Sequence, residues 1–498
     1  MTQQNLTNRA SAAPPTMSEN RLATGRLGTW DIVFFVLSAA APLTVVVSSA
    51  PTAFRIGGIG APGAMLVAGV VLVFFAIGFT AMSKTVKNSG AFYAYVSRGI
   101  GKPVGIGIAL VTLFAYLFLT ICFYAYFGFY AEFTAQELFG ITLPWWLWAL
   151  GALATVSFLG HRQIDVGAKV LAVLLSAEIA VLLVFSVVVI INGGPEQWSL
   201  APFNPQYIFF GTSSGMLFVT AFGAFLGFES TAIYAEEAKH PERTIPAATF
   251  IAVAFLALFY AGTFWILTVA FGVEGVIQLA LGDGFETMVI TGAGEAVGPW
   301  AAWVMKLLIV TSFLACLISF HNASSRYTFN LGRDRLIPRV FGRTHPRTHA
   351  PYIASFAISA ICAVAIVLAA LLGSDPFLGL GLWTYATGVQ GLVFAQAAAA
   401  VAVVMYFAKD RQGHSVWRVV VAPVIGALGL IVSFVLIVTN FEFVTGLEGP
   451  INWVLLLPTP VLLIVGIIYG LVLRRRAPQH YSTLTETISV AEIAESAE

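Results

Sequence analysis

Residues 222–229 read FGAFLGFE and lie in the middle of an apolar run that extends over 212–236. The run is long enough to cross a bilayer, which takes about 20 helical residues. It nevertheless places two glycines, Gly223 and Gly227, and the carboxyl group of Glu229 at mid-depth. Glycine lets a helix unwind at low steric cost, and a carboxyl group in hydrocarbon normally faces the interior of a helix bundle. The pattern predicts a buried span that is interrupted.

A second interruption is predicted in the first apolar run, over 30–53. Residues 38–44 read SAAAPLT, so Pro42 lies at mid-membrane, where it donates no backbone hydrogen bond and clashes with the preceding turn. Taken singly, each feature is equally explained by a proline kink or by glycine packing. The two fall in the first and sixth predicted spans, five helices apart, so two units of five helices would be inverted relative to each other. Corresponding broken helices in inverted halves are typical of the central site of secondary transporters.

The rest of the chain predicts an all-α polytopic membrane protein. Hydrophobic residues make up 58% of the chain and charged residues 10%, against roughly 25% charged in a typical soluble protein. A chain of this composition needs lipid as its solvent. Twelve runs are long enough to span a membrane. They cover 30–53, 61–83, 103–131, 143–160, 166–191, 212–236, 244–271, 300–322, 350–372, 383–408, 416–439 and 450–473.

These runs divide the chain into five parts. We expect a first five-helix repeat over 30–191, a second, inverted repeat over 212–408, and two extra helices over 416–473. Residues 1–29 are polar, and we expect a disordered cytoplasmic tail there. We expect a second cytoplasmic tail over 474–498, polar and disordered after Arg476. Residues 1–29 lack the short apolar core and cleavage pattern of a signal peptide.

The distribution of charge predicts that both termini are cytoplasmic. With that orientation, all of the 25 Lys and Arg residues except Arg55 and Lys306 fall at or near the inner side. The predicted external loops carry acidic residues instead. Two carboxyl groups lie deep within spans, at Glu178 and Glu229. We therefore expect a multi-pass protein of the cell membrane.

Several classes of protein do not fit the sequence. The net charge of +1 gives no basic field for nucleic acid. No His, Cys, Asp or Glu residues occur at metal-ligand spacing, and there is no nucleophile elbow or P-loop. We therefore expect no catalytic residue, metal, cofactor or ATP-driven step. The three cysteines, Cys122, Cys316 and Cys362, lie in apolar runs and are interpreted as small buried hydrophobes.

Three motifs in order resemble the amino acid–polyamine–organocation (APC) superfamily, the amino-acid permeases. Residues 225–230 (FLGFES) and 235–246 (AEEAKHPERTIP) resemble its sixth helix and the following loop. Residues 88–95 (NSGAFYAY) resemble the entry to its third helix, and residues 332–338 (GRDRLIP), after Asn322 and Arg326, the end of its eighth. The first helix departs from the family, because residues 39–44 read AAAPLT where many members have a Gly-Ser-Gly or Gly-Thr-Gly run.

The resemblance implies a secondary active transporter of amino acids that works by alternating access and is coupled to protons. A carrier or exchanger of polyamines or other small organic solutes is the alternative. The partners expected are an amino-acid substrate, the proton and the bilayer, and both a monomer and a homodimer stay open. An unwound helix offers free amides to a carboxylate and free carbonyls to an ammonium group, so no charged side chain is required. By resemblance, the carboxylate pocket is bordered by Ala41, Pro42, Leu43 and Thr44, and the ammonium side by Phe222, Gly223 and Phe225.

Other residues carry two interpretations each. Phe222 and Phe320 are candidate gates by resemblance, and simple packing is the alternative. Glu178 stands where many family members have a lysine, and it is either a proton-coupling group or a hydrogen-bonded structural residue. Glu229 is either a second proton-coupling group or a cap for the resumed half-helix. Glu236 and Glu237, with Lys239 and Arg243, suggest a salt-bridged inner latch or a solvated loop in preference to a substrate site. His321 is interpreted as a satisfied polar residue, with a ligand as the alternative.

Overall fold

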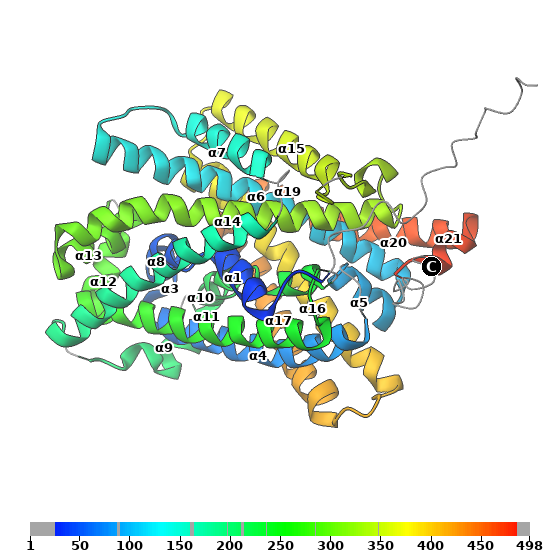
Figure 1. Cartoon of the computed structure of the whole chain (residues 1–498). Helices are drawn as coiled ribbons and strands as arrows, with labels where there is room; N and C mark the ends of the chain where they lie inside the picture. The colour runs from blue at the N-terminus through cyan, green and yellow to red at the C-terminus, as the bar shows by residue number, and fades with distance from the viewer. Residues whose placement is uncertain are drawn as a thin grey trace, which may run out of the picture.

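The computed structural model describes residues 25–86, 90–159, 164–196, 198–210, 214–235, 237–283, 285–346 and 348–485 (Figure 1). Within these ranges the regular secondary structure is helical, apart from one isolated bridge between Leu27 and Ala238. The α-helices are α1 (Thr29–Ala40), α2 (Pro42–Thr44), α3 (Ala50–Gly57), α4 (Ala61–Thr85), α5 (Phe92–Gly99), α6 (Lys102–Phe139), α7 (Trp145–Leu159), α8 (Ile164–Asn192), α9 (Pro205–Phe209), α10 (Ser214–Ala224), α11 (Pro241–Phe271), α12 (Val273–Leu281), α13 (Met288–Val297), α14 (Pro299–Arg333), α15 (Tyr352–Leu371), α16 (Leu382–Lys409), α17 (Ala422–Thr439), α18 (Phe441–Thr445), α19 (Ile451–Leu456), α20 (Pro458–Arg476) and α21 (Pro478–Thr483).

Ten helical stretches of the described chain are long and apolar enough to cross a membrane, where the sequence predicts twelve. The difference arises at two places. The predicted spans 30–53 and 61–83 belong to one helical stretch of 57 residues, Thr29–Thr85, in which a 3₁₀ turn at Gly58–Gly60 joins α3 to α4. The predicted fourth span forms only the 15-residue helix α7.

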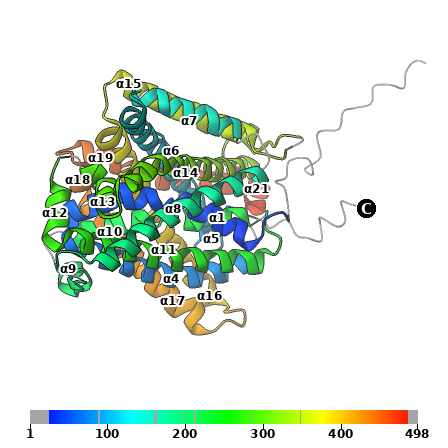
Figure 2. The same ribbon diagram turned by 60° about the vertical axis from the view of Figure 1, so that its left-hand side comes forward.

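The helices form one bundle around the long helices α6 and α14 (Figures 1 and 2). Helix α6 packs against α14, α16 and α20, and α11 packs against α4. Helices α7 and α15 lie side by side at the edge of the bundle in both views. The contact between α6 and α20 is close because it is made by glycines: a Cβ atom on Gly466 would collide with the backbone of Gly107.

The first span is interrupted at the predicted proline. Helix α1 ends at Ala40, Ala41 adopts φ 42° and ψ 75°, and α2 begins at Pro42. This left-handed conformation is costly for a residue with a Cβ atom. Proline at the first position of α2 fits the restart, since its fixed φ is helical and its missing N–H would have no partner there. A π-helical turn over Val45–Ser49 then leads into α3.

The second interruption lies between α10, which ends at Ala224, and a 3₁₀ helix over Phe228–Tyr234. Gly227 has φ 107°, a conformation that glycine adopts without the strain a side chain would bring. The sequence thus has a residue without a Cβ atom at the position where the backbone adopts a left-handed conformation.

Both described chain ends dock on one end of the bundle, which we call the terminal face. The backbone amides of Arg26 and Leu27 donate to the Glu237 carbonyl at 3.0 Å. At the other chain end, the Lys102 ammonium donates to the carbonyl of Tyr481 at 2.8 Å, and an imidazole nitrogen of His480 lies 2.8 Å from the Asp334 carbonyl oxygen. Residues 25–28 and 477–485, where the sequence predicts disordered tails, are held in place by these hydrogen bonds and by the short helix α21.

Candidate functional site

A cavity of about 50 Å³ lies beside the two interruptions. Its lining contains hydroxyl groups, small apolar residues and aromatic rings, and no Asp, Glu, Lys, Arg or His among the described residues. The lining residues are Ala39, Ala40, Ala41, Thr44, Val45, Ser48, Ser49, Thr52, Phe123, Tyr126, Thr220, Gly223, Ala224, Leu226, Cys316, Leu382 and Tyr385. A space of this size, with hydroxyl groups in a mainly apolar lining, holds a few waters or the compact head of a small solute.

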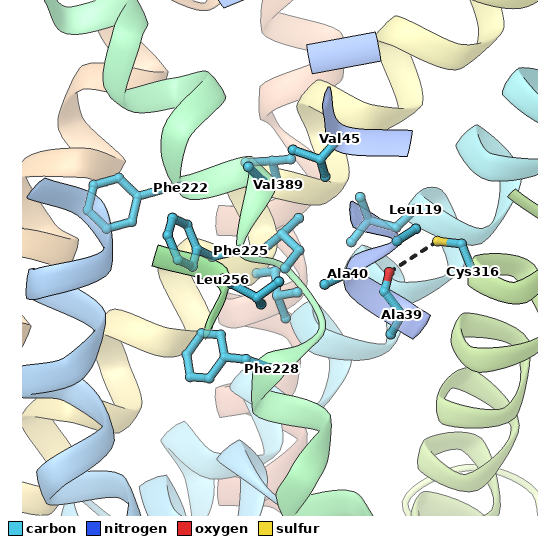
Figure 3. Close-up of a cluster of buried hydrophobic side chains, with 14 of the residues drawn as sticks. Ala39, Ala40, Val45, Leu119, Phe222, Phe225, Phe228, Leu256, Cys316 and Val389 are labelled. Atoms are coloured by element: carbon cyan, nitrogen blue, oxygen red, sulfur yellow. Dashed lines mark hydrogen bonds between the residues drawn. The ribbon is translucent and has the colours of Figure 1, made fainter. Parts of the chain in front are cut away.

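The carbonyl groups at the end of α1 accept hydrogen bonds from other helices. The Cys316 thiol of α14 donates to the Ala39 carbonyl at 3.2 Å, as Figure 3 shows, and the Tyr260 hydroxyl of α11 donates to the Ala40 carbonyl at 2.9 Å. A carbonyl oxygen has two lone pairs, so each retains capacity for one more donor. The interruption therefore presents fixed acceptors along the cavity wall.

The start of α2 is tied to a carboxyl group of α8. Glu178 is 1% exposed, and its Oε2 accepts from the Ser312 hydroxyl of α14 at 2.8 Å. Ser312 in turn accepts from the Thr44 hydroxyl at 3.0 Å. The backbone amide of Leu43 also donates to Glu178. One buried carboxyl group thus links α2, α8 and α14, and it caps the free amide end of the restarted helix.

Glu229 occupies the corresponding place after the second interruption. Its carboxyl group is 1% exposed and accepts from the Gly227 amide at 3.1 Å, the Tyr116 hydroxyl at 3.1 Å and the Gln396 side-chain amide at 3.4 Å. These donors come from the break itself, from α6 and from α16. Glu229 therefore holds the interrupted segment between two scaffold helices.

The aromatic residues predicted at the site do not line the cavity. Figure 3 shows the rings of Phe222 and Phe225 projecting from the ribbon on the side away from Ala39 and Ala40. The Phe225 ring packs edge-on against Tyr260 with 5.7 Å between centroids. The Phe320 ring lies behind the wall, with its centroid 4.7 Å from that of Phe123, which does line the cavity.

The structure brings three of the predicted substrate residues to the cavity: Ala41, Thr44 and Gly223. Pro42 and Leu43 lie just outside the lining, where the Leu43 amide faces Glu178. At Gly223 there is no room for a side chain, because a Cβ atom would collide with the Tyr385 hydroxyl oxygen.

Sequence reasoning missed the tyrosines and the cysteine that shape this site. Tyr126, Tyr385 and Tyr260 lie in long apolar runs in which nothing distinguishes them from other aromatic residues. The sequence predicts Cys316 to be a small buried hydrophobe, and it is buried, yet its thiol also completes the hydrogen bonding of α1. The helix break at Pro42 leaves buried carbonyl groups without a partner in their own helix. Each such carbonyl needs a hydrogen-bond donor from elsewhere, and a search for donors could have started from this requirement.

The polar cluster predicted after the sixth span forms a buried ion pair at the terminal face, with a different partner. The Arg326 guanidinium of α14 pairs with Glu237, with Nε–Oε1 at 2.5 Å and Nη2–Oε2 at 3.2 Å. It also lies over the Tyr234 ring, 5.1 Å from the centroid. The prediction that joined Glu237 with Lys239 and Arg243 did not include this arginine. Glu236 lies outside the described residues, and His321 lies 2.8 Å from the Ser355 hydroxyl.

Comparison with known protein sequences identifies relatives of this chain. A family model described as amino acid permease matches residues 27–470. The branched-chain amino acid permease BcaP of Bacillus subtilis is 24% identical over 368 residues, which cover 70% of this chain and 74% of the relative. The methylthioribose transporter of the same organism is 26% identical over 254 residues, 51% of this chain and 50% of the relative. Human cationic amino acid transporter 4 is 27% identical over 238 residues, 46% of this chain and 35% of the relative.

Proposed function

This chain belongs to the amino acid permease family, which makes it a membrane transporter and not an enzyme, and on that premise we propose that it carries a small zwitterionic amino acid by alternating access, coupled to protons. The observation that carries the proposal is the cavity at the two helix interruptions, whose described lining has no charged side chain. A zwitterion needs donors and acceptors in close pairs and no net opposite charge, and interrupted helices offer both through the backbone.

The chemistry of the lining supports one substrate class over another. The ammonium group would lie against the carbonyls of Ala39 and Ala40, and the carboxylate beside Thr44 and Ser48. To donate to the carboxylate, the two hydroxyl groups would turn from their present acceptors, Ser312 and the Thr44 carbonyl. Alanine and glycine at the break keep the space small, which favours a compact or aliphatic side chain. A polyamine would need acidic walls to offset its desolvation, so it fits this lining less well.

A second candidate is an uncharged solute. One relative is named for methylthioribose transport, and a neutral sugar with a thioether would also be compatible with hydroxyl groups and apolar walls. It would, however, leave unused the ammonium site that the α1 carbonyls form in our proposal.

We assign the proton to Glu178 and a positioning role to Glu229. Protonation of Glu178 would remove the charge that the Leu43 amide stabilises and would change the link from α2 to Ser312. Since α2 borders the cavity, proton binding and the geometry of the site would be coupled. Glu229 is held by donors from two scaffold helices, which suits a residue that fixes the second interruption.

The proposed transport cycle uses twelve spans in two inverted repeats, with α7 as the short fourth span and the terminal face in the cytoplasm. Two observations support a conformation closed on that side: the buried Arg326–Glu237 pair and the docking of Leu27 on Ala238. The cavity extends away from the terminal face, along Ser48, Ser49 and Thr52 of the restarted first span. Opening the terminal face would require the Arg326–Glu237 pair to separate.

Purified protein in proteoliposomes provides the test. We expect uptake of one or more of alanine, serine, valine, leucine and isoleucine, driven by an inward proton gradient, and counterflow of the same substrate without a gradient. Methylthioribose and putrescine form the comparison arms. Counterflow of methylthioribose alone would replace the amino-acid proposal with the second candidate, and rapid flux without counterflow would contradict a carrier.

A further inference from the structure

A groove of about 580 Å³ lies on the outside of the bundle near the terminal face, well away from the transport cavity. It is formed by α6, α20 and the loop that follows α14. The residues that line it are Leu110, Arg335, Leu336, Ile337, Pro338, Arg339, Val465 and Tyr469. We propose that this groove binds one anionic phospholipid, with its phosphate between Arg335 and Arg339 and an acyl chain along Leu110 and Val465.

The groove has separate charged and apolar parts. Arg335 and Arg339 are exposed and form its charged end, and no acidic residue contributes to the described lining. Guanidinium groups pair with phosphate through two parallel hydrogen bonds, which an ammonium group cannot do. The remaining lining is aliphatic apart from Tyr469. Such a lining would contribute little to binding of a free phosphate and suits a ligand that also has a hydrocarbon chain.

The two parts lie at the depths that a lipid requires. Helix α20 ends in Arg474, Arg475 and Arg476, a basic run of the kind that marks a membrane surface. Tyr469 is five residues before this run, about 7.5 Å deeper along the helix axis, and Val465 lies a further turn below. Tyrosine is common at the headgroup boundary. Val465 is 48% exposed and lies where acyl chains would be.

The loop is held in a shape that presents the arginines. Arg335 has φ 57°, a conformation that costs a residue with a side chain on the order of 1 kcal/mol or more. The conformation is fixed on both sides: the Arg335 amide donates to the Gly332 carbonyl at 3.1 Å, and the Leu336 amide to the Leu331 carbonyl at 2.9 Å. These two bonds form the C-terminal cap of α14, so the end of the helix fixes the backbone that carries the Arg335 side chain.

A second copy of this chain is a poorer occupant. In a two-fold dimer the same patch meets itself, so Arg335 and Arg339 would face the arginines of the other copy. Like charges in contact are unfavourable without acidic partners. A phospholipid supplies the opposite charge and covers the exposed valine at the same time.

Native mass spectrometry of the full chain, titrated with dioleoyl phosphatidylglycerol, tests the proposal. We expect the double variant Arg335→Gln/Arg339→Gln to bind this lipid at least tenfold more weakly. Arg343→Gln is the matched control, since Arg343 is an exposed arginine outside the groove lining, and it should bind as the parent does. Val465→Trp, which fills the apolar part and keeps both arginines, should also weaken binding.

Several outcomes would overturn the proposal. Equal binding of dioleoyl phosphatidylcholine would mean that the arginines do not select charge. Full competition by glycerol phosphate at the same concentration would reduce the groove to an anion site. Unchanged lipid binding by the double variant would show that the two arginines form no lipid site. A change from dimer to monomer in that variant would show that the groove is covered by a second copy of the chain. Because the readout is lipid binding, the result is independent of whether amino acids are the transported substrate.

Discussion

The two helix interruptions border one cavity but are stabilised in different ways. At the first, groups on other helices complete the backbone hydrogen bonding: Cys316 and Tyr260 serve the α1 carbonyls, and Glu178 serves the α2 amide. At the second, the chain largely completes its own hydrogen bonding. The Phe225 amide donates to the Phe222 carbonyl at 3.3 Å, and the Gly227 amide to the Glu229 carboxylate at 3.1 Å.

This difference assigns different roles to the two breaks. The second break is a local structure that Gly227 makes possible, and Glu229 ties it to α6 and α16, so it would keep its shape as long as it stays with those two helices. The first break depends on α8, α11 and α14, so a shift of any of these changes its hydrogen bonds. Coupling between a proton site and the substrate site is therefore expected at the first break, and rigid shape at the second.

The largest expected effect tests the rigid shape of the second break. Gly223→Val should lower uptake by well over tenfold, because the new side chain would collide with the Tyr385 hydroxyl at the cavity wall. A tenfold loss corresponds to about 1.4 kcal/mol. Initial uptake rates and counterflow should both fall, measured in proteoliposomes with equal amounts of folded protein.

Gly262→Val provides the control for this substitution. Gly262 lies in α11, and a Cβ atom added there would meet no neighbouring group within 4 Å, so valine should leave uptake near the parent value. Gly223→Ala should also lower uptake, and adding Tyr385→Phe to it should restore part of that uptake, since the new Cβ atom collides with the hydroxyl oxygen. Normal transport by Gly223→Val would show that the second break does not shape the site.

The next effect tests coupling at the first break. Glu178→Gln should abolish substrate accumulation driven by a proton gradient while counterflow persists, because a glutamine cannot gain or lose the proton. Glu229→Gln should instead lower both activities together, since it disturbs the segment that Tyr116 and Gln396 hold. Glu137→Gln, at an exposed acid, is the control. If Glu178→Gln still accumulated substrate in response to a proton gradient, the coupling proton would have to bind at another residue.

These contrasts also explain what could be predicted from the sequence. Pro42 and Gly227 affect the backbone through their own covalent structure, whatever residues pack around them. The structure has an interruption at each of these two residues, as the sequence predicts. Long apolar runs predicted most of the spans for the same reason. The hydrogen-bond partners of the first break lie far away in sequence: Tyr260 is 220 positions from Ala40, and Cys316 is 277 positions from Ala39. Such pairings arise only from packing, so no local pattern identifies them.

The ordering of the terminal face was missed for a related reason. Residues 478–485 are polar and lack an apolar period, so they resemble a disordered tail. Their order comes from donors on other segments: the Arg98 guanidinium donates to the Thr485 carbonyl at 3.1 Å, and Lys102 to the Tyr481 carbonyl. Backbone carbonyls have no sequence signature, so this docking could not be predicted.

A smaller effect is expected where a single hydrogen bond to the first break is removed. Tyr260→Phe removes the donor to the buried Ala40 carbonyl and should destabilise the protein by about 1–2 kcal/mol. Thermal unfolding in detergent would measure the change in stability. If Tyr260 holds the carbonyl in place for the ammonium group, the binding free energy of the substrate should weaken by a similar amount. Tyr406→Phe, whose hydroxyl accepts from Gln412 in an exposed position, should have no effect on either quantity.

The smallest effect concerns Cys316, and it separates a hydrogen bond from a packing contact. A thiol is a weak donor, so Cys316→Ala should cost no more than about 1 kcal/mol through the Ala39 carbonyl, plus a small cavity term. Cys316→Ser keeps the geometry and supplies a stronger donor, so it should retain stability and substrate affinity close to the parent. Cys362→Ser is the matched control, because Cys362 is equally buried in α15 and belongs to no described hydrogen bond. There the hydroxyl gains no known partner and the substitution should be destabilising. If Cys316→Ser proved as damaging as Cys362→Ser, the thiol would be only a packing group, and the dependence of the first break on α14 would rest on Ser312 alone.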